Sequence, residues 1–291
     1  MPRLVSASAL VAIASALACS HPSQVSFVSN ERPTAQGAQA GMPPPSAAHA
    51  ENPNGATELP NDDEIVEPDH PTADTRQERA LVHIHGPNGA VCSGVMLGPS
   101  IVATAQRCIR GEGRKKGVTE LSAAREYRVE IASSTLTWTN RRAKYALRPD
   151  CDWNELDVAI LVLAEPAPWV QPLKVISAPN TGAKVQALGF GNCPGQPRGM
   201  KDRFGTVRSR VSEAVVIDVP LCKGDTGGPV VDGADGDVIG VISRRDDPEG
   251  SPLRTTTIAR LDTTQARALF EQAKLLAAGG DASKVTTVAC R

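Results

Sequence analysis

Short apolar runs rich in β-branched residues recur from Ala80 to Ser243, and turn-forming residues separate each run from the next. The nine runs cover residues 80–84, 91–97, 100–104, 127–132, 157–163, 184–188, 211–219, 228–232 and 238–243. Runs at this spacing, with no helical period between them, indicate an all-β sandwich or a pair of barrels. Aromatic residues are only 3% of the chain, so we expect a core of Val, Ile, Leu and Ala.

One helix is expected after the last strand. The segment Asp262–Gln265 resembles a capping box, and Gly279 and Gly280 are suited to end a helix. The residues expected on its apolar face are Leu269, Phe270, Ala273 and Leu276.

The first 19 residues have the pattern of an export signal. Arg3 is followed by an apolar run of 15 residues, Leu4 to Ala18, which is too short to span a bilayer. The run ends at Ala16-Leu17-Ala18-Cys19, which resembles the lipobox of bacterial lipoproteins, where the cysteine is acylated. Ala16 stands where that motif usually has Leu, so ordinary signal-peptidase cleavage is the alternative to lipidation of Cys19.

Residues 20–76 are rich in Pro, Ser, Ala, Gln, Gly and Asn and hold few large apolar side chains. Such a segment cannot offset its ordering entropy, so we expect a disordered linker before a folded domain at residues 77–291. The formal net charge of -1 argues against nucleic acid as a partner. Seven cysteines without a CxxC pair favour disulfides in an oxidising compartment. We therefore expect an extracytoplasmic protein, either a cell-envelope lipoprotein attached to a membrane through Cys19 or a secreted protein.

Three motifs occur in a fixed order within the folded segment. The first comprises CSGVML at 92–97 and IVATAQRC at 101–108, the second is NELDVAIL at 154–161, and the third is CKGDTGGP at 222–229. Together they resemble the trypsin/chymotrypsin-like serine peptidase family (S1 type) over residues 65–277. The resemblance implies two six-stranded antiparallel β-barrels with a C-terminal α-helix.

Peptidases of this family use a serine, a histidine and an aspartate, and the resemblance identifies the three matching positions. Asp157 matches the aspartate, Arg107 stands at the histidine position, and Thr226 stands at the serine position. A guanidinium stays protonated at working pH and cannot act as the general base. The backbone amides of Gly224 and Thr226 match the family's oxyanion hole and could bind an anion or a carbonyl.

These departures predict a catalytically degenerate homologue that acts by binding a protein or peptide, as a monomer and without a cofactor. One alternative is an active or residually active endopeptidase that uses Thr226 as its nucleophile. Another is a structural envelope protein without a ligand.

The resemblance also locates the substrate pocket. Pro220 stands where a trypsin carries its specificity aspartate, and Ser243, Arg244 and Arg245 match the substrate-binding strand. The two arginines are expected to fill the cleft, either as a new ligand site or as the result of drift after loss of catalysis.

Disulfide expectations follow from the same resemblance. It implies the pair Cys92–Cys108. The other pairs expected are Cys193–Cys222 and Cys151–Cys290, the first because the usual partner of Cys222 is absent.

Ile65-Val66 lies about where the family forms a new N-terminus by cleavage. Glu64 precedes it, so no tryptic cleavage is implied, and Pro68 argues against insertion of a freed amine toward Asp225. The other interpretation is a coincidental Ile-Val pair.

Three further clusters have simple structural explanations. His83 and His85 alternate on one strand face, but no third metal ligand is evident, so we expect a solvated pair and no metal site. The second cluster is expected in a hairpin turn rather than a calcium loop, and it comprises Asp232, Asp235 and Asp237. The third cluster is expected in a solvated loop that could alternatively contact an acidic partner, and it comprises Arg110, Arg114, Lys115 and Lys116.

Overall fold

A computed structural model describes residues 75–109, 117–120, 127–133, 137–193, 199–245 and 255–290. The strands within these ranges are β1 (Leu81–His85), β2 (Val91–Gly98), β3 (Ile101–Thr104), β4 (Gly117–Glu120), β5 (Arg128–Ala132), β6 (Trp138–Arg148), β7 (Ala159–Leu163), β8 (Lys184–Gly189), β9 (Lys201–Arg210), β10 (Ala214–Ile217), β11 (Pro229–Asp232), β12 (Val238–Arg245) and β13 (Thr256–Arg260). The helices are α1 (Arg76–Ala80) and α2 (Thr264–Ala277), with short 3₁₀ turns η1 (Pro87–Gly89), η2 (Gln106–Cys108) and η4 (Ala282–Lys284).

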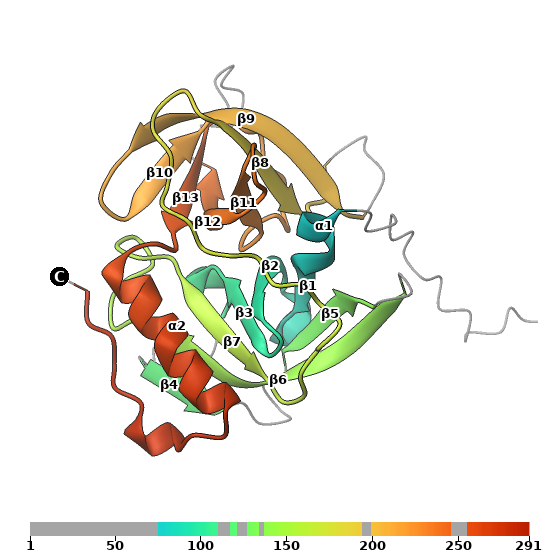
Figure 1. Ribbon diagram of the computed structural model, residues 1–291, viewed down its shortest axis with the longest axis vertical. Coiled ribbons are helices and arrows are strands. Elements are labelled where there is room, and N and C mark those ends of the chain that lie inside the picture. The colour runs from blue at the N-terminus through green and yellow to red at the C-terminus, as the bar shows by residue number, and fades with distance from the viewer. Residues whose placement is uncertain are drawn as a thin grey trace, which may run out of the picture. The chain divides into compact units, whose positions relative to one another are not determined.

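The strands close into two antiparallel barrels of six strands each (Figure 1). The first barrel has the order β6-β5-β1-β2-β3-β7 and is closed by pairing of β6 with β7, while β4 extends it at the free edge of β6. The second barrel has the order β10-β13-β12-β11-β8-β9 and is closed by pairing of β9 with β10. This architecture confirms the fold predicted from the sequence.

Aliphatic side chains fill both barrels, as the low aromatic content predicts. All five residues of β7 are buried, and β1 places Val82 and Ile84 in the core while His83 and His85 point to its other face. The largest fully buried side chains are mainly Leu and Ile, but Tyr127 is fully buried as well. The core therefore depends on aliphatic packing with one aromatic exception among these large residues.

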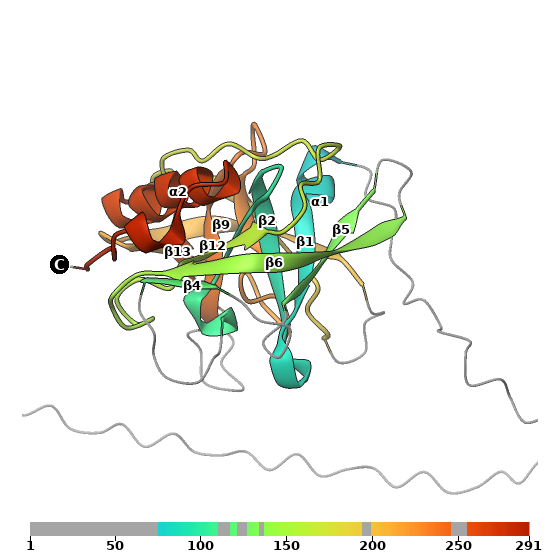
Figure 2. The ribbon, with the colours of Figure 1, turned by 90° about the horizontal axis from the view of Figure 1, so that it is seen from below.

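Four strands were not predicted, and two of them are the longest in the structure. β6 has 11 residues and extends along the first barrel between β4 and β5 (Figure 2), and β9 has 10 residues. Each carries two exposed basic residues, Arg142 and Lys144 in β6 and Arg208 and Arg210 in β9, and further polar residues interrupt the apolar pattern of both strands. The other two are β4 and β13.

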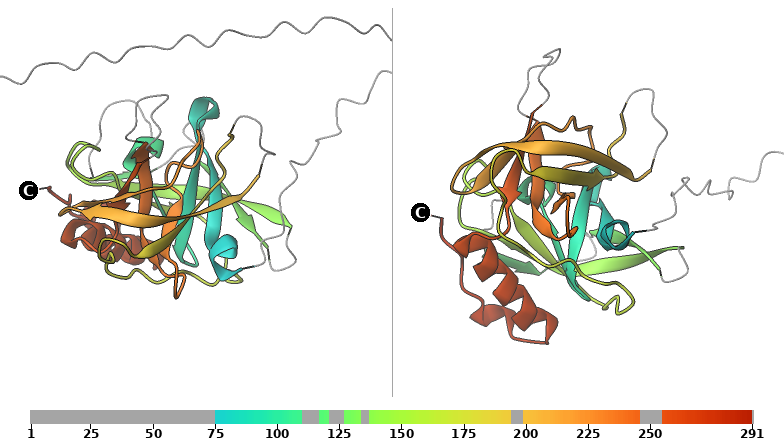
Figure 3. Two further views of the ribbon diagram at one scale, coloured as in Figure 1. Left: turned by 90° about the horizontal axis from the view of Figure 1, so that it is seen from above. Right: turned by 45° about the horizontal axis from the view of Figure 1, so that its top comes forward.

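α2 lies on the outside of the first barrel and packs on β7 (Figure 3). Its buried face contains Ala266, Leu269, Ala273 and Leu276, and Phe270 is only partly buried. The helix begins one residue later than predicted, because the Thr263 hydroxyl, rather than Asp262, caps the Ala266 amide at 3.1 Å.

Helix α1 was also not predicted, since its five residues are too few to show a period. It begins with a capping box in which the Thr75 hydroxyl accepts from the Glu78 amide and the Glu78 carboxylate accepts from the Thr75 amide. Neither described helix is long and apolar enough to cross a membrane. The predicted signal segment, Cys19, Ile65 and the linker up to residue 74 lie outside the described residues, whereas Thr75 and Arg76, the last two residues of the predicted linker, begin α1.

Candidate functional site

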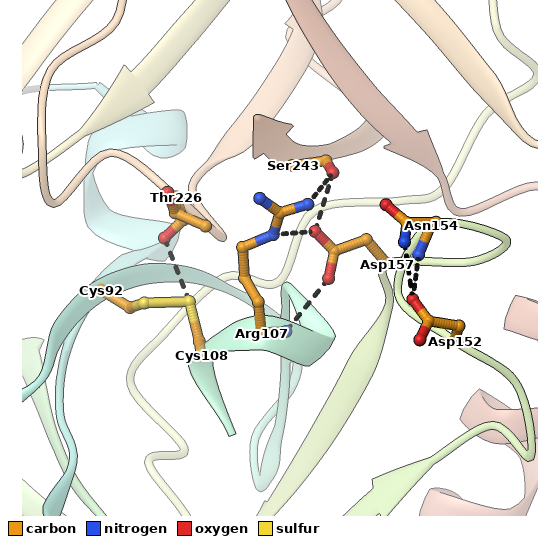
Figure 4. Close-up of polar contacts among 8 residues, drawn as sticks. All are labelled: Cys92, Arg107, Cys108, Asp152, Asn154, Asp157, Thr226 and Ser243. Atoms are coloured by element: carbon orange, nitrogen blue, oxygen red, sulfur yellow. Dashed lines mark hydrogen bonds and ion pairs between the residues drawn. A yellow bond between two sulfur atoms is a disulfide. The ribbon is translucent and has the colours of Figure 1, made fainter. Parts of the chain in front are cut away.

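Arg107 lies at the junction of the two barrels, in the turn η2 that follows β3. The turn is held by the disulfide between Cys108 and Cys92 of β2. It is also held by the Cys108 amide, which donates to the Ala105 carbonyl at 3.0 Å. A short turn fixed in this way places the Arg107 side chain against Asp157 from the segment before β7 and Ser243 from β12 (Figure 4).

Four hydrogen bonds link these residues. The Arg107 Nε donates to Asp157 Oδ2 at 2.6 Å, and the Arg107 backbone amide donates to Oδ1 at 3.0 Å. The Ser243 hydroxyl donates to Asp157 Oδ2 at 2.7 Å. The same hydroxyl oxygen accepts from Arg107 Nη2 at 3.1 Å. Both carboxylate oxygens of Asp157 therefore have N–H or O–H partners.

Burial dominates the electrostatics of Asp157. Its side chain is 2% exposed, whereas that of Arg107 is 23% exposed. Desolvation raises the pKa of Asp157, although the Arg107 charge and the hydrogen bond from Ser243 act in the opposite direction. The guanidinium also lies over the ring of Trp153, with Cζ 4.3 Å from the ring centroid. Arg107 is thus fixed on one side by a buried carboxylate and on another by an aromatic ring.

Thr226 lies near this cluster, in the turn between Cys222 and β11. Its carbonyl accepts from the Ser93 amide at 2.8 Å and lies 3.6 Å from the Cys108 sulfur. That sulfur is disulfide-bonded and has no proton to donate, so this second approach is only a contact. The polar contacts found for Thr226 thus involve its carbonyl and fix the backbone of the turn.

The turn also presents two free backbone amides. The amides of Asp225, Gly227 and Gly228 donate to the carbonyls of Cys222, Ile242 and Asp225, at 3.1, 2.7 and 2.9 Å. The amides of Gly224 and Thr226 donate to no acceptor among the described residues. Gly224 has φ +107°, a left-handed conformation that glycine adopts without strain. Unpaired amides two residues apart in a turn can bind an anion or a carbonyl oxygen.

Asp225 is fully buried, and donors of the same chain compensate the charge of its carboxylate. Its Oδ1 accepts from the Gly191 amide at 2.7 Å, and its Oδ2 accepts from the Cys222 amide at 2.8 Å and from Arg203 Nη1 at 2.9 Å. The Arg203 side chain is 12% exposed. Sequence reasoning did not find Arg203, because it lies in β9, which was itself not predicted. A guanidinium thus occupies the place beside Asp225 at which a freed amine was considered.

The residues predicted to form the pocket differ in burial. Ser243 is buried and belongs to the Arg107 cluster, while Pro220 and Arg244 are exposed. The side chain of Arg245 lies outside the described residues, so cleft filling by the two arginines stays a prediction.

The structure contains three disulfides in its described part. They are Cys92–Cys108, Cys151–Cys290 and Cys193–Cys222, and they coincide with the pairs expected from the sequence. Cys151–Cys290 attaches the segment after α2 to the first barrel, where Asp150 and Ala289 also form a β-bridge.

The expectation of a solvated histidine pair is wrong. His83 Nδ1 and His85 Nε2 lie 3.0 and 2.9 Å from Oε2 of Glu130, a residue of the neighbouring strand β5, and all three side chains are at most 26% exposed. A third possible ligand therefore exists, 45 positions or more away in the sequence.

Asp232 ends β11, and Asp235 and Asp237 lie in the turn between β11 and β12. The Asp232 amide donates to the Asp237 carbonyl at 2.9 Å, so this segment is a hairpin connection, as expected. The basic residues Arg110, Arg114, Lys115 and Lys116 lie outside the described residues.

Chemically, the guanidinium of Arg107 offers N–H donors and no acceptor. The Asp157 carboxylate already accepts from three donors. The amides of Gly224 and Thr226, which have no acceptor among the described residues, can stabilise negative charge on a bound oxygen.

Comparison with protein-family models gives a match to the family described as Trypsin over residues 69–266. A search of curated protein sequences gives no match. Among solved structures, the chain resembles mouse neuropsin, "a serine protease expressed in the limbic system of mouse brain", with a TM-score of 0.53 and 18% sequence identity. That alignment covers 69% of this chain and 96% of neuropsin.

Proposed function

The chain belongs to the trypsin family, and from this premise we propose that it is a non-cleaving member that acts by binding a peptide or protein segment. The observation that carries the proposal is the 2.6 Å hydrogen bond from Arg107 Nε to the buried carboxylate of Asp157. A guanidinium occupies the position from which an imidazole would take the proton of the nucleophile. Hydrolysis by the family's mechanism therefore has no general base.

Thr226 cannot easily compensate for this loss. Its β-methyl group stiffens the first side-chain torsion and crowds the approach to a carbonyl. Without a neighbouring base its hydroxyl remains protonated and is a weak nucleophile. Where triad residues have been removed from serine peptidases, about 10³–10⁴-fold acceleration over water remains, far below that of a working enzyme.

The amides of Gly224 and Thr226 support a binding role. They have no acceptor among the described residues, so a carbonyl or carboxylate oxygen of a ligand can accept from both. An extended peptide that places a carbonyl there gains this interaction without a covalent step. The proposed ligand is accordingly a peptide or a segment of another protein.

A reactive-site probe tests the proposal. Wild-type protein, Thr226→Ala and an active trypsin-family enzyme are incubated with a fluorophosphonate, which labels an activated hydroxyl. We expect no labelling of wild type or Thr226→Ala, and strong labelling of the active enzyme. Labelling of wild type that disappears in Thr226→Ala would support the alternative of a residual endopeptidase.

A peptide-capture experiment distinguishes a binding function from a purely structural role. Wild type, Thr226→Pro, which removes one of the two amides, and Thr226→Ala, which keeps it, are used to capture peptides from a synthetic library. Retention of defined sequences by wild type and Thr226→Ala, and their loss from Thr226→Pro, supports the proposal. No retention by any of the three proteins favours the structural alternative, and equal retention by all three shows that binding does not use this amide. Circular dichroism and urea unfolding establish that Thr226→Pro is folded.

We further propose that the chain is exported and is attached to a membrane through acylated Cys19. The proposal rests on the apolar run Leu4 to Ala18 and the lipobox-like segment before Cys19. Its test is detergent-phase partitioning of wild type and Cys19→Ala after expression in a bacterium. A lipoprotein enters the detergent phase only with Cys19 intact, and equal partitioning of both proteins would exclude lipidation at this residue.

A further inference from the structure

His83, His85 and Glu130 form a compact group on the outward faces of two paired strands of the first barrel. His83 and His85 are two positions apart on β1, so their side chains lie on one face. The antiparallel register places Glu130 of β5 opposite His83. Backbone pairing of these strands therefore fixes the relative positions of all three side chains before any ligand is present.

The three side chains direct their polar atoms at one another. Glu130 Oε2 lies 3.0 Å from His83 Nδ1 and 2.9 Å from His85 Nε2. One ligand atom from each residue lies within 4.8 Å of the others. The contact with His83 has hydrogen-bond geometry, whereas the buried Nε2 of His85 has no hydrogen-bond partner among the described residues. One imidazole nitrogen thus points at the carboxylate without using its hydrogen-bonding capacity.

The group is partly shielded from water. The side chains of His83, His85 and Glu130 are 16%, 26% and 18% exposed. The His83 ring packs on Phe190 from the second barrel at a centroid distance of 4.7 Å, and Phe190 in turn contacts Trp138 at 5.4 Å. Aromatic packing on one side limits the rotation of His83, and the remaining exposure of the three side chains gives solvent access to the group.

We propose that His83, His85 and Glu130 bind a divalent transition-metal ion, and that zinc(II) fits them best. Imidazole nitrogen and carboxylate oxygen are ligands that zinc prefers, and three protein ligands leave a fourth position for water. Ligand distances of about 2.0–2.2 Å place neighbouring ligand atoms about 3.3 Å apart at tetrahedral angles. The observed 2.9 and 3.0 Å separations need to open by only a few tenths of an ångström.

One carboxylate and two imidazoles supply the donor atoms that a divalent cation needs. Exposed Arg128, opposite His85 in the strand register, is a cation on the same sheet and reduces the attraction without blocking the ligand atoms. Glu155 also lies near two sulfurs, those of Cys151 and Cys290, but their disulfide excludes them as ligands.

Zinc titration of the full chain tests the site. Metal-stripped protein with intact disulfides is titrated calorimetrically with zinc chloride, in parallel with His83→Asn, Glu130→Gln and the control Glu165→Gln. Glu165 is an exposed glutamate outside the group, with 76% of its side chain accessible. We expect wild type and Glu165→Gln to bind zinc with equal affinity. Each ligand variant should bind zinc at least about tenfold more weakly, because removal of even an outer-shell partner of a metal site causes a loss of that size.

Three other histidines, His21, His49 and His70, lie outside the described residues and are unchanged in every variant. The difference between variant and wild type therefore reports the proposed site alone. If Glu130→Gln does not fold, as judged by circular dichroism, His85→Gln replaces it, because His85 Nε2 makes no hydrogen bond that the fold would lose.

Cobalt(II) supplies a second readout. A tetrahedral cobalt complex absorbs visible light strongly, and this absorption should appear in wild type and disappear in the ligand variants. Zinc affinity equal in wild type and every ligand variant, or no zinc binding by wild type, would overturn the proposal. The inference does not depend on the proposed binding function, since a metal site on β1 and β5 is compatible with either presence or absence of peptidase activity.

Discussion

Removal of the Arg107 side chain should lower the free energy of unfolding of the protein. In Arg107→Ala, Asp157 loses its charge-assisted partner at 2.6 Å, Ser243 loses its contact with Nη2, and Trp153 loses the cation above its ring. The backbone amide of residue 107 and the Ser243 hydroxyl remain beside the carboxylate. The substitution therefore leaves Asp157 buried and only partly compensated.

The magnitude follows from burial. Breaking a fully buried ion pair by removing one partner costs about 3–5 kcal/mol. Because Arg107 is 23% exposed and Asp157 keeps two donors, we expect the free energy of unfolding to fall by about 2–3 kcal/mol. The matched control is Arg208→Ala. This residue is 59% exposed and pairs with Asp218 on the surface, where such a pair contributes about 0–1 kcal/mol.

The loss should depend on pH. Burial raises the pKa of Asp157 and Arg107 opposes that rise, so the pKa in Arg107→Ala is higher still. A folded-state pKa above the unfolded value means that the folded state binds a proton first as the pH falls. The unpaired charge then disappears, and the difference in stability between variant and wild type shrinks toward acidic pH.

Urea unfolding of both proteins with intact disulfides, at neutral and mildly acidic pH, measures this. A loss below about 1 kcal/mol at neutral pH, or a loss that grows on acidification, would refute the reasoning. Either result would mean that Arg107 does not compensate a buried carboxylate.

Three further predictions concern other charged and capping groups. Arg203→Met should lower the free energy of unfolding by about 3–5 kcal/mol, since Asp225 is fully buried beside it, and urea unfolding checks this. Burial would raise the pKa of Asp262, but hydrogen bonds from Arg260 lower this pKa overall. The contribution of Asp262 to stability is therefore present above the pKa of the unfolded state and is lost as the pH falls through the pKa of the folded state. Acid-unfolding curves of Asp262→Asn should therefore be less pH-dependent than those of wild type, and an unchanged curve would count against this. Thr263→Ala removes the cap of α2 and should lower the free energy of unfolding by about 1 kcal/mol, as measured by thermal unfolding. An unchanged free energy of unfolding would show that the cap is dispensable.

The sequence was sufficient for the fold because its strongest signals are local or carried by motifs. β7 is a continuous apolar run, and its burial on both faces follows directly. β6 and β9 were missed because alternating charged residues interrupt their apolar pattern, and only barrel closure makes them strands. The positions of Arg107 and Asp157 followed from the family motifs.

Contacts between distant strands were not accessible from the sequence. Glu130 lies 45 positions or more from the histidines, and the register of β1 with β5 is what brings it to them. Arg203 reaches Asp225 from β9, a strand without a sequence signal. In both cases the residue type carried no special information until the barrel placed it beside a partner.

The most direct test of the central claim is hydrolysis of a broad peptide library by wild type and by Thr226→Ala, measured by mass spectrometry against the uncatalysed rate. The account predicts that the two proteins are indistinguishable, because Arg107 supplies no base to the Thr226 hydroxyl. Cleavage by wild type that disappears in Thr226→Ala would contradict it, since that result requires a general base for the Thr226 hydroxyl, and position 107 holds an arginine in place of an imidazole.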